Sequence, residues 1–132
     1  FGIAVTELTA IGREEWPAVT MIVFRNYQWG AEKRNSTLWY EDNFIGTELD
    51  DKVSYAGIAQ ACGLQGVQAR TMDELTAALH TAVEDQMKHG KTTLIEAMIN
   101  QELGEPFRRD AMKNPVAVAG ISADDMRVQT VE

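Results

Sequence analysis

Cysteine, histidine and proline are scarce in this sequence, with one, two and three among its 132 residues. Cys62 has no partner for an internal disulfide, which suits a reducing compartment, so we expect a cytoplasmic location. It precedes Gly63 at an expected helix end, where a small buried apolar side chain is a better interpretation than a nucleophile. His80 and His89 share no face of their expected helix, which argues against a zinc site.

Long apolar runs and an excess of positive charge are also missing. No run of about 18 apolar residues occurs, and no basic segment leads into an apolar one at the N-terminus, so we expect neither a membrane span nor a signal peptide. The net charge of −8 argues against nucleic acid or an anionic membrane as a partner. The sequence has no Gly-x-Ser-x-Gly elbow and no glycine-rich loop of the kind that binds phosphate.

An initiator methionine is absent as well. The chain starts at Phe1, and the helical spacing of Val5, Leu8 and Ile11 follows at once with no strand before it. The simplest interpretation is a piece of a longer polypeptide. The 132 residues, 45% of them hydrophobic, leave room for one domain with a real core.

Apolar spacing predicts alternating helices and strands, which favours parallel strands with right-handed crossovers. We therefore predict an α/β fold: a three-layer domain with a parallel sheet flanked by helices, over residues 1–100. Residues 101–132 lose the periodicity and are expected to form an extended C-terminal tail. In chain order the expected elements are helix 3–15, strand 18–25, an irregular region 26–50 that is functional or contains a short helix, helix 52–62, strand 66–70, a helix that starts after Thr71, and strand 92–99.

The helix after Thr71 has the clearest boundaries. Thr71 and Glu74 fit a capping box, and Gly90 is a typical stop. Five apolar side chains fall on one face of this helix, and the sheet is expected to lie under it: Leu75, Leu79, Ala82, Val83 and Met87.

Polar residues follow the strand that ends at Arg25, and the carboxyl end of a strand is where ligands bind in open α/β sheets. Asn26 offers a neutral side-chain oxygen suited to Mg²⁺, and Gln28 could add its backbone carbonyl. Gly30 allows close approach of a bulky ligand. The alternative interpretation of Asn26 is a loop asparagine that tolerates a tight turn.

Two neighbouring clusters are open to two interpretations each. Glu32, Lys33 and Arg34 form either a solvated charge cluster or a contact to an anionic substrate. The aromatic residues of the same region either wall a cofactor pocket or subunit contact, or form a satellite hydrophobic cluster under a long loop: Trp29, Trp39, Tyr40 and Phe44.

Residues 1–30 resemble the cofactor-binding half of the thiamine-diphosphate enzymes. Their motif is Gly-Asp-Gly, about two dozen residues of helix and strand, and a terminal Asn. Phe1-Gly2-Ile3 looks like the residues just after Gly-Asp-Gly, and Asn26 matches the terminal Asn. Residues 25–35 and 105–113 more narrowly resemble the sulfoacetaldehyde acetyltransferase branch of that family.

The resemblance implies a site for thiamine diphosphate and Mg²⁺. Asn26 would ligate Mg²⁺ through its side chain and Gln28 through its backbone oxygen. Gly30, with Tyr27 or Trp29, would line the diphosphate pocket, and Gly2 would lie beside the phosphates. The aspartate of Gly-Asp-Gly and the glutamate that activates the cofactor are absent from this chain, so the catalytic residues are expected outside it.

The resemblance also implies a reaction and partners. Sulfoacetaldehyde and phosphate would be converted to acetyl phosphate and sulfite in taurine breakdown. The cleft would need the remainder of the same polypeptide and a second subunit, in a homodimer or homotetramer. The alternatives are another thiamine-diphosphate enzyme, such as an acetolactate-synthase-like carboligase or a 2-oxo acid decarboxylase, or a non-catalytic α/β interaction module.

Overall fold

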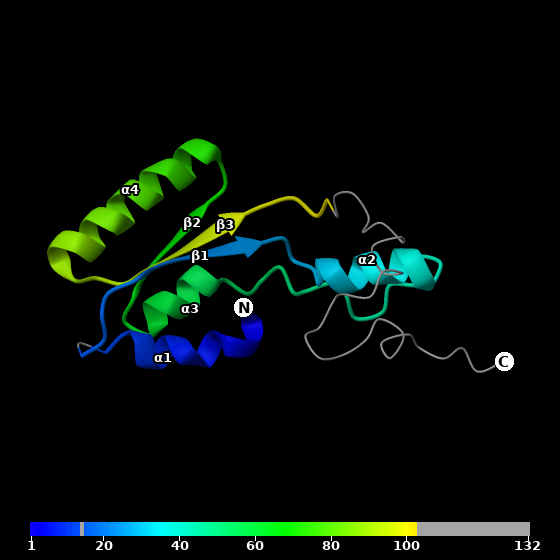
Figure 1. The fold of residues 1–132 in the computed structure, drawn as a ribbon, viewed down its shortest axis with the longest axis horizontal. Helices are drawn as coiled ribbons and strands as arrows, with labels where there is room; N and C mark the ends of the chain where they lie inside the picture. The colour runs from blue at the N-terminus through cyan, green and yellow to red at the C-terminus, as the bar shows by residue number, and fades with distance from the viewer. Residues whose placement is uncertain (14, 103–132) are drawn as a thin grey trace, which may run out of the picture. The chain divides into compact units, whose positions relative to one another are not determined.

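The computed structural model of the chain describes residues 1–13 and 15–102. Its three strands form one parallel sheet in the order β1-β3-β2 (Figure 1). Each strand lies within two residues of its predicted position, so the predicted α/β fold with a parallel sheet is confirmed. The strands are β1 (Thr20–Arg25), β2 (Gln65–Ala69) and β3 (Thr93–Met98).

Helices cover both faces of the sheet, which gives the three predicted layers. α1 (Leu8–Ile11) and α3 (Tyr55–Ala61) lie on one face, and α4 (Met72–His89) lies on the other (Figure 1). β3 is the central strand and is buried from Thr93 to Ala97. The core on the first face consists of Leu8, Val23, Tyr55, Ala59, Leu64 and Leu94, and the core on the second consists of Ala69, Ala82 and Ile95.

The α4 helix begins and ends as its sequence predicts. Thr71 Oγ1 accepts the backbone N–H of Glu74 at 3.1 Å, the Glu74 carboxylate accepts the N–H of Thr71 at 3.2 Å, and Gly90 is left-handed with φ 62°. The predicted core face of this helix is wrong at two positions. Val83 is 49% exposed and Met87 is 77% exposed.

The physical reason is the position of α4 on the sheet. Its packed side chains meet Ala69 of β2 and Ile95 of β3, whereas it contacts β1 through a polar hydrogen bond that Thr20 Oγ1 donates to Gln86 Oε1 at 2.8 Å. The covered stripe of α4 is therefore Leu75, Ala78, Leu79 and Ala82, and the side chains that point past it remain in solvent.

Two further helices differ from the predictions, and the short helix that was one of the expectations for residues 26–50 is present. The first helix is a 3-10 turn, η1 (Gly2–Glu7), followed by the short α1, and no side chain caps its start. The 26–50 region contains α2 (Gly30–Trp39), also without a side-chain cap, so no capping residue marks its bounds in the sequence. Helix α3 begins later than predicted because Ser54 Oγ accepts the N–H of Gly57 at 3.0 Å and sets the cap there.

The predicted tail lies outside the described residues from 103 onward, as does the 105–113 match. Within the part of the chain that the structure describes, no helix has the length and apolar character needed to cross a membrane.

Candidate functional site

The polar loop after β1 forms a tight turn. Asn26 Oδ1 accepts the backbone N–H of Gln28 at 3.2 Å, and Tyr27 between them has a left-handed φ of 57°. Asn26 therefore forms the predicted turn, and its role as a Mg²⁺ ligand stays a prediction that is compatible with the turn, since an amide oxygen has a second lone pair for another partner.

Residues 47–49 form backbone hydrogen bonds with this turn. The N–H of Trp29 donates to the carbonyl of Thr47 at 2.7 Å, and the N–H of Leu49 donates to the carbonyl of Tyr27 at 2.8 Å. The two bonds flank an antiparallel bridge between Gln28 and Glu48. The start and the end of the predicted irregular region therefore pair with each other.

A cavity of about 360 Å³ brings the two ends of the predicted motif together. Gly2, Asn26, Gln28 and Trp29 all line it. Tyr27 and Gly30 are not among the described residues that line it: the Tyr27 ring lies against Arg25, and Gly30 is the first residue of α2. The remaining lining residues are Phe1, Ile3, Val23, Phe24, Arg25, Leu49 and Tyr55.

The absence of a side chain at Gly2 matters for this cavity. A Cβ atom there would lie 3.0 Å from the Tyr55 hydroxyl oxygen, closer than about nine in ten real Cβ contacts. The Phe1 ring also packs edge-on to Tyr55, with 4.9 Å between centroids. A larger residue at position 2 would therefore crowd the wall of the cavity.

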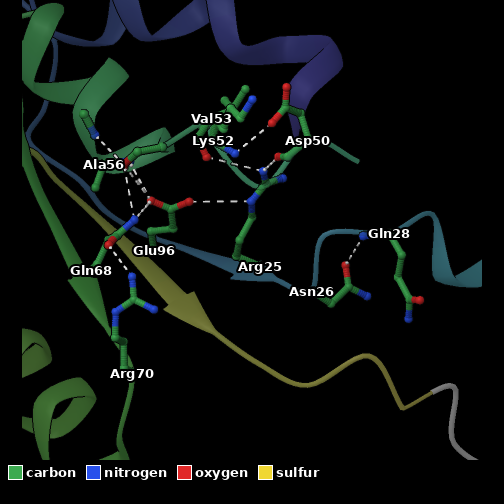
Figure 2. Close-up of polar contacts among 12 residues, drawn as sticks. Arg25, Asn26, Gln28, Asp50, Lys52, Val53, Ala56, Gln68, Arg70 and Glu96 are labelled. Carbon is green, nitrogen blue, oxygen red and sulfur yellow. Dashed lines mark hydrogen bonds and ion pairs between the residues drawn. The ribbon is translucent and has the colours of Figure 1, made fainter. Parts of the chain in front are cut away.

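A buried carboxylate, Glu96 of β3, lies on the α3 side of the sheet (Figure 2). Its Oε2 accepts hydrogen bonds from Ser54 Oγ at 3.0 Å, from the N–H of Ala56 at 3.1 Å and from Gln68 Nε2 at 3.0 Å. Gln68 in turn accepts a hydrogen bond from Arg70 at 3.2 Å. Glu96 therefore joins β3 to β2 and to the N-terminus of α3.

Burial is the largest single influence on the pKa of Glu96 and raises it. Hydrogen bonds from Gln68, Ser54 and the first backbone amides of α3 together outweigh burial and hold the pKa below its ordinary value. Glu96 is therefore ionised at neutral pH inside the domain.

The other oxygen of Glu96 faces Arg25. Arg25 Nε lies 3.7 Å from Glu96 Oε1, and the two side chains are 3% and 0% exposed. Arg25 Nη2 donates to the backbone carbonyls of Asp50 at 2.7 Å and Val53 at 3.3 Å (Figure 2). Arg25 thus carries a compensated positive charge directly before Asn26.

Lys33, interpreted from the sequence as either part of a solvated charge cluster or a substrate contact, has internal partners in this structure. Its ammonium pairs with the Glu48 carboxylate and donates to Gln28 Oε1 at 3.2 Å. The hydrogen bond from Lys33 is the main cause that lowers the pKa of Glu48. Lys33 therefore supports the residues beside the cavity, and contact with a substrate remains a prediction.

The aromatic residues of this region are largely exposed. Trp39 and Tyr40, at the end of α2, are 55% and 68% exposed, while Phe44 contacts Lys33 with 5.2 Å from ammonium to ring centroid. Trp29 is the member of the predicted aromatic set that lines the cavity. The four aromatic residues therefore do not form one wall of the cavity.

The described residues provide neutral oxygens for a cation. Asn26 and Gln28 lie at the cavity, and no group of three His, Cys, Asp or Glu side chains in residues 1–13 and 15–102 could hold a metal ion. Amide and carbonyl oxygens are of the type that Mg²⁺ accepts, so the donors present fit part of a magnesium site.

Sequence reasoning missed Arg25, Glu96 and Tyr55 as parts of this region. A signal for Glu96 was available, since a carboxylate inside the apolar run Thr92–Ile99 must find partners when the strand is buried. Nothing local to the sequence identified Arg25 as its partner.

Comparison with known proteins gives consistent matches. The family model described as thiamine pyrophosphate enzyme, C-terminal TPP binding domain, matches residues 1–97; thiamine pyrophosphate is another name for thiamine diphosphate. The chain is 80% identical over 132 residues to a sulfoacetaldehyde acetyltransferase of Roseovarius nubinhibens, covering all of this chain and 22% of that protein. It is 79% identical over 129 residues to one of Rhodobacter capsulatus, covering 98% and 22%.

A more distant relative, the sulfoacetaldehyde acetyltransferase of Castellaniella defragrans, is 44% identical over 116 residues, covering 88% of this chain and 19% of that protein. The chain thus spans about a fifth of the length of the curated relatives it matches. The family match covers both ends of the cavity, Gly2 and the turn at Asn26, in one domain. The chain belongs to the thiamine pyrophosphate enzymes, in the family of their C-terminal TPP-binding domain.

Proposed function

We propose that this chain is the C-terminal part of a thiamine-diphosphate- and Mg²⁺-dependent sulfoacetaldehyde acetyltransferase. The enzyme would convert sulfoacetaldehyde and phosphate to acetyl phosphate and sulfite, in taurine breakdown. The observation that carries this proposal is the 80% identity to a protein of that name over all 132 residues of the chain.

The residues at the cavity support a role in holding the cofactor. Asn26 would bind Mg²⁺ through its side-chain oxygen and Gln28 through its backbone oxygen, while Gly2 and Trp29 would lie beside the diphosphate. Thiamine diphosphate, when bound, supplies a carbon nucleophile that adds to a carbonyl and stabilises the resulting charge. The contribution of this chain is binding and orientation, and the catalytic residues are expected in the rest of the protein.

The partners we propose are the remainder of the polypeptide and a second subunit, in a homodimer or homotetramer of the cytoplasm. β1 is an edge strand of the described sheet, and its Ile22 and Phe24 are 41% and 67% exposed. An edge strand with exposed apolar side chains supports a missing neighbour from the same protein.

The test of the activity uses the full-length protein with sulfoacetaldehyde, phosphate, Mg²⁺ and thiamine diphosphate. We expect release of sulfite and formation of acetyl phosphate, both dependent on phosphate and on the cofactor. Turnover of pyruvate to acetolactate or acetaldehyde, with no sulfite from sulfoacetaldehyde, would instead favour the carboligase or decarboxylase alternative. No turnover of either substrate, with no cofactor binding, would favour an interaction module.

The metal site is tested by Asn26→Ala in the same full-length protein. We expect the Mg²⁺ and thiamine diphosphate concentrations for half-maximal activity to rise, because a site that demands near-octahedral geometry loses an oxygen ligand. Asn35→Ala, an exposed position on α2, is the matched control and should leave both concentrations unchanged. Unchanged cofactor requirements in Asn26→Ala would remove Asn26 from the metal site.

A further inference from the structure

The Arg25 guanidinium is held by groups from three separate segments. Glu96 of β3 faces its Nε, and the carbonyls of Asp50 and Val53 accept hydrogen bonds from its Nη2. The ring of Tyr55, at the start of α3, lies 4.6 Å from its central carbon. With 3% of its side chain exposed, Arg25 is a fixed part of the domain.

The remaining side of Arg25 meets the turn itself. The Tyr27 ring centroid lies 4.5 Å from the central carbon of the guanidinium, so the cation contacts two aromatic rings, those of Tyr27 and Tyr55. Tyr27 has a φ of 57°, a conformation that bulky side chains rarely adopt without support. The contact with Arg25 offsets the unfavourable backbone conformation because a desolvated guanidinium attracts an aromatic face.

Asn26 lies between these two residues, so the packing of Arg25 and Tyr27 fixes its backbone on both sides. We infer that Arg25 is a positioning residue: clamped by Glu96, it holds Tyr27 in the left-handed turn and thereby orients the Asn26 oxygen at the cavity. This inference rests on the proposed function, since it assigns the turn to binding of Mg²⁺ and diphosphate.

A purely structural role for Arg25 makes a different prediction. If Arg25 served only to neutralise Glu96, Arg25→Lys would keep the charge and preserve the site. A lysine ammonium lacks the flat guanidinium that stacks on Tyr27 and donates in two directions, so it cannot hold the turn. Tyr27→Leu tests the positioning role of Arg25 without changing charge neutralisation, because it removes the aromatic ring and leaves the Arg25–Glu96 ion pair intact.

The experiment uses the full-length protein and measures the dissociation constant of thiamine diphosphate with Mg²⁺ by calorimetry, together with the melting temperature. Arg25→Lys and Tyr27→Leu should weaken cofactor binding by about 10- to 100-fold, the range for residues that orient metal ligands. Tyr27→Phe, which keeps the ring, is the conservative rescue and should recover the binding that Tyr27→Leu loses. Lys88→Gln, which breaks an exposed ion pair on α4, is the control for loss of a charged pair.

A crystal structure of each variant supplies a readout that needs no cofactor. We expect Tyr27 to leave the left-handed region and Asn26 to move in Arg25→Lys and Tyr27→Leu. Wild-type binding in both variants with an unmoved turn would overturn the role of Arg25 while leaving the proposed function standing. A wild-type protein that does not bind the cofactor would overturn the proposed function, and with it the assignment of Arg25 to that site.

Discussion

Glu96 is the residue that joins most of the described domain. It lies on the central strand, accepts hydrogen bonds from Gln68 of β2 and from the start of α3, and faces Arg25 of β1. An ionised carboxylate in such a position needs all of these partners, because an unpaired buried charge is costly. Removing it would leave Arg25 as an uncompensated buried cation.

The acid sensitivity of the fold should follow from Glu96. Its pKa is lower in the folded than in the unfolded protein, so ionised Glu96 stabilises the fold above the unfolded pKa. That stabilisation is lost as the pH falls through the lower, folded pKa. In the full-length protein, Glu96→Gln should therefore reduce stability at pH 7 by about 3–5 kcal/mol. The difference from wild type should shrink towards acid pH.

Melting temperatures measured from pH 7 downward check this prediction. Glu84→Gln, which removes an exposed partner of Lys88, is the matched control and should follow the wild-type pH profile. Parallel profiles for Glu96→Gln and wild type would show that Glu96 does not contribute through its charge.

At the scale of elements, α3 and β2 approach each other closely at Gly66. A Cβ atom at Gly66 would come within 2.0 Å of the backbone oxygen of Ala56 and 2.8 Å of its carbonyl carbon. Because both contacts are to backbone, a rotamer change cannot relieve them. Gly66 therefore sets the distance between α3 and the sheet, and α3 supplies the amides that bind Glu96.

Gly66→Ala should destabilise the full-length protein by at least about 1–3 kcal/mol, because α3 must move away from β2. The shift should also weaken cofactor binding, since Tyr55 of α3 lines the cavity. Gly57→Ala is the control within the same helix: its Cβ would meet Ser54 at an ordinary 3.5 Å and should be tolerated. Thermal unfolding of both variants tests the pair, and equal melting temperatures would contradict the close approach.

At the scale of the whole molecule, the described residues leave apolar surface without a partner. Phe24 on the edge strand, Met87 on α4 and Ile45 in the loop after α2 are 67%, 77% and 79% exposed. The chain also spans 22% of its 80%-identical relative. We interpret these surfaces as contacts to the remainder of the protein and to a second subunit.

Residues 1–132 produced alone should show no acetyl transfer and no micromolar binding of thiamine diphosphate. The described residues that line the cavity include no carboxylate and offer Mg²⁺ neutral oxygens, which are a poor match for two positive charges. The exposed apolar surface should also make the isolated chain associate. Calorimetric titration and analytical ultracentrifugation, with the full-length protein as control, are the measurements. Tight stoichiometric cofactor binding by the isolated chain would mean that it carries a complete site.

The sequence by itself determined the features that depend on neighbouring residues. The three predicted strands are present, and Thr71, Glu74 and Gly90 set the bounds of α4, because hydrophobic period and capping are local. The sequence also predicted correctly that Asn26 follows β1 directly. The resemblance to the thiamine-diphosphate enzymes was carried by short motifs, and the family match confirms it.

Only the tertiary structure decided which residues meet across the chain. The register pairs Val23 with Glu96, so Arg25, two residues further on the same face of β1, reaches that carboxylate. The exposure of Val83 and Met87 likewise depends on which strands lie under α4. Such contacts join residues many positions apart, and no local pattern encodes them, because strand order and register are set by packing of the whole domain.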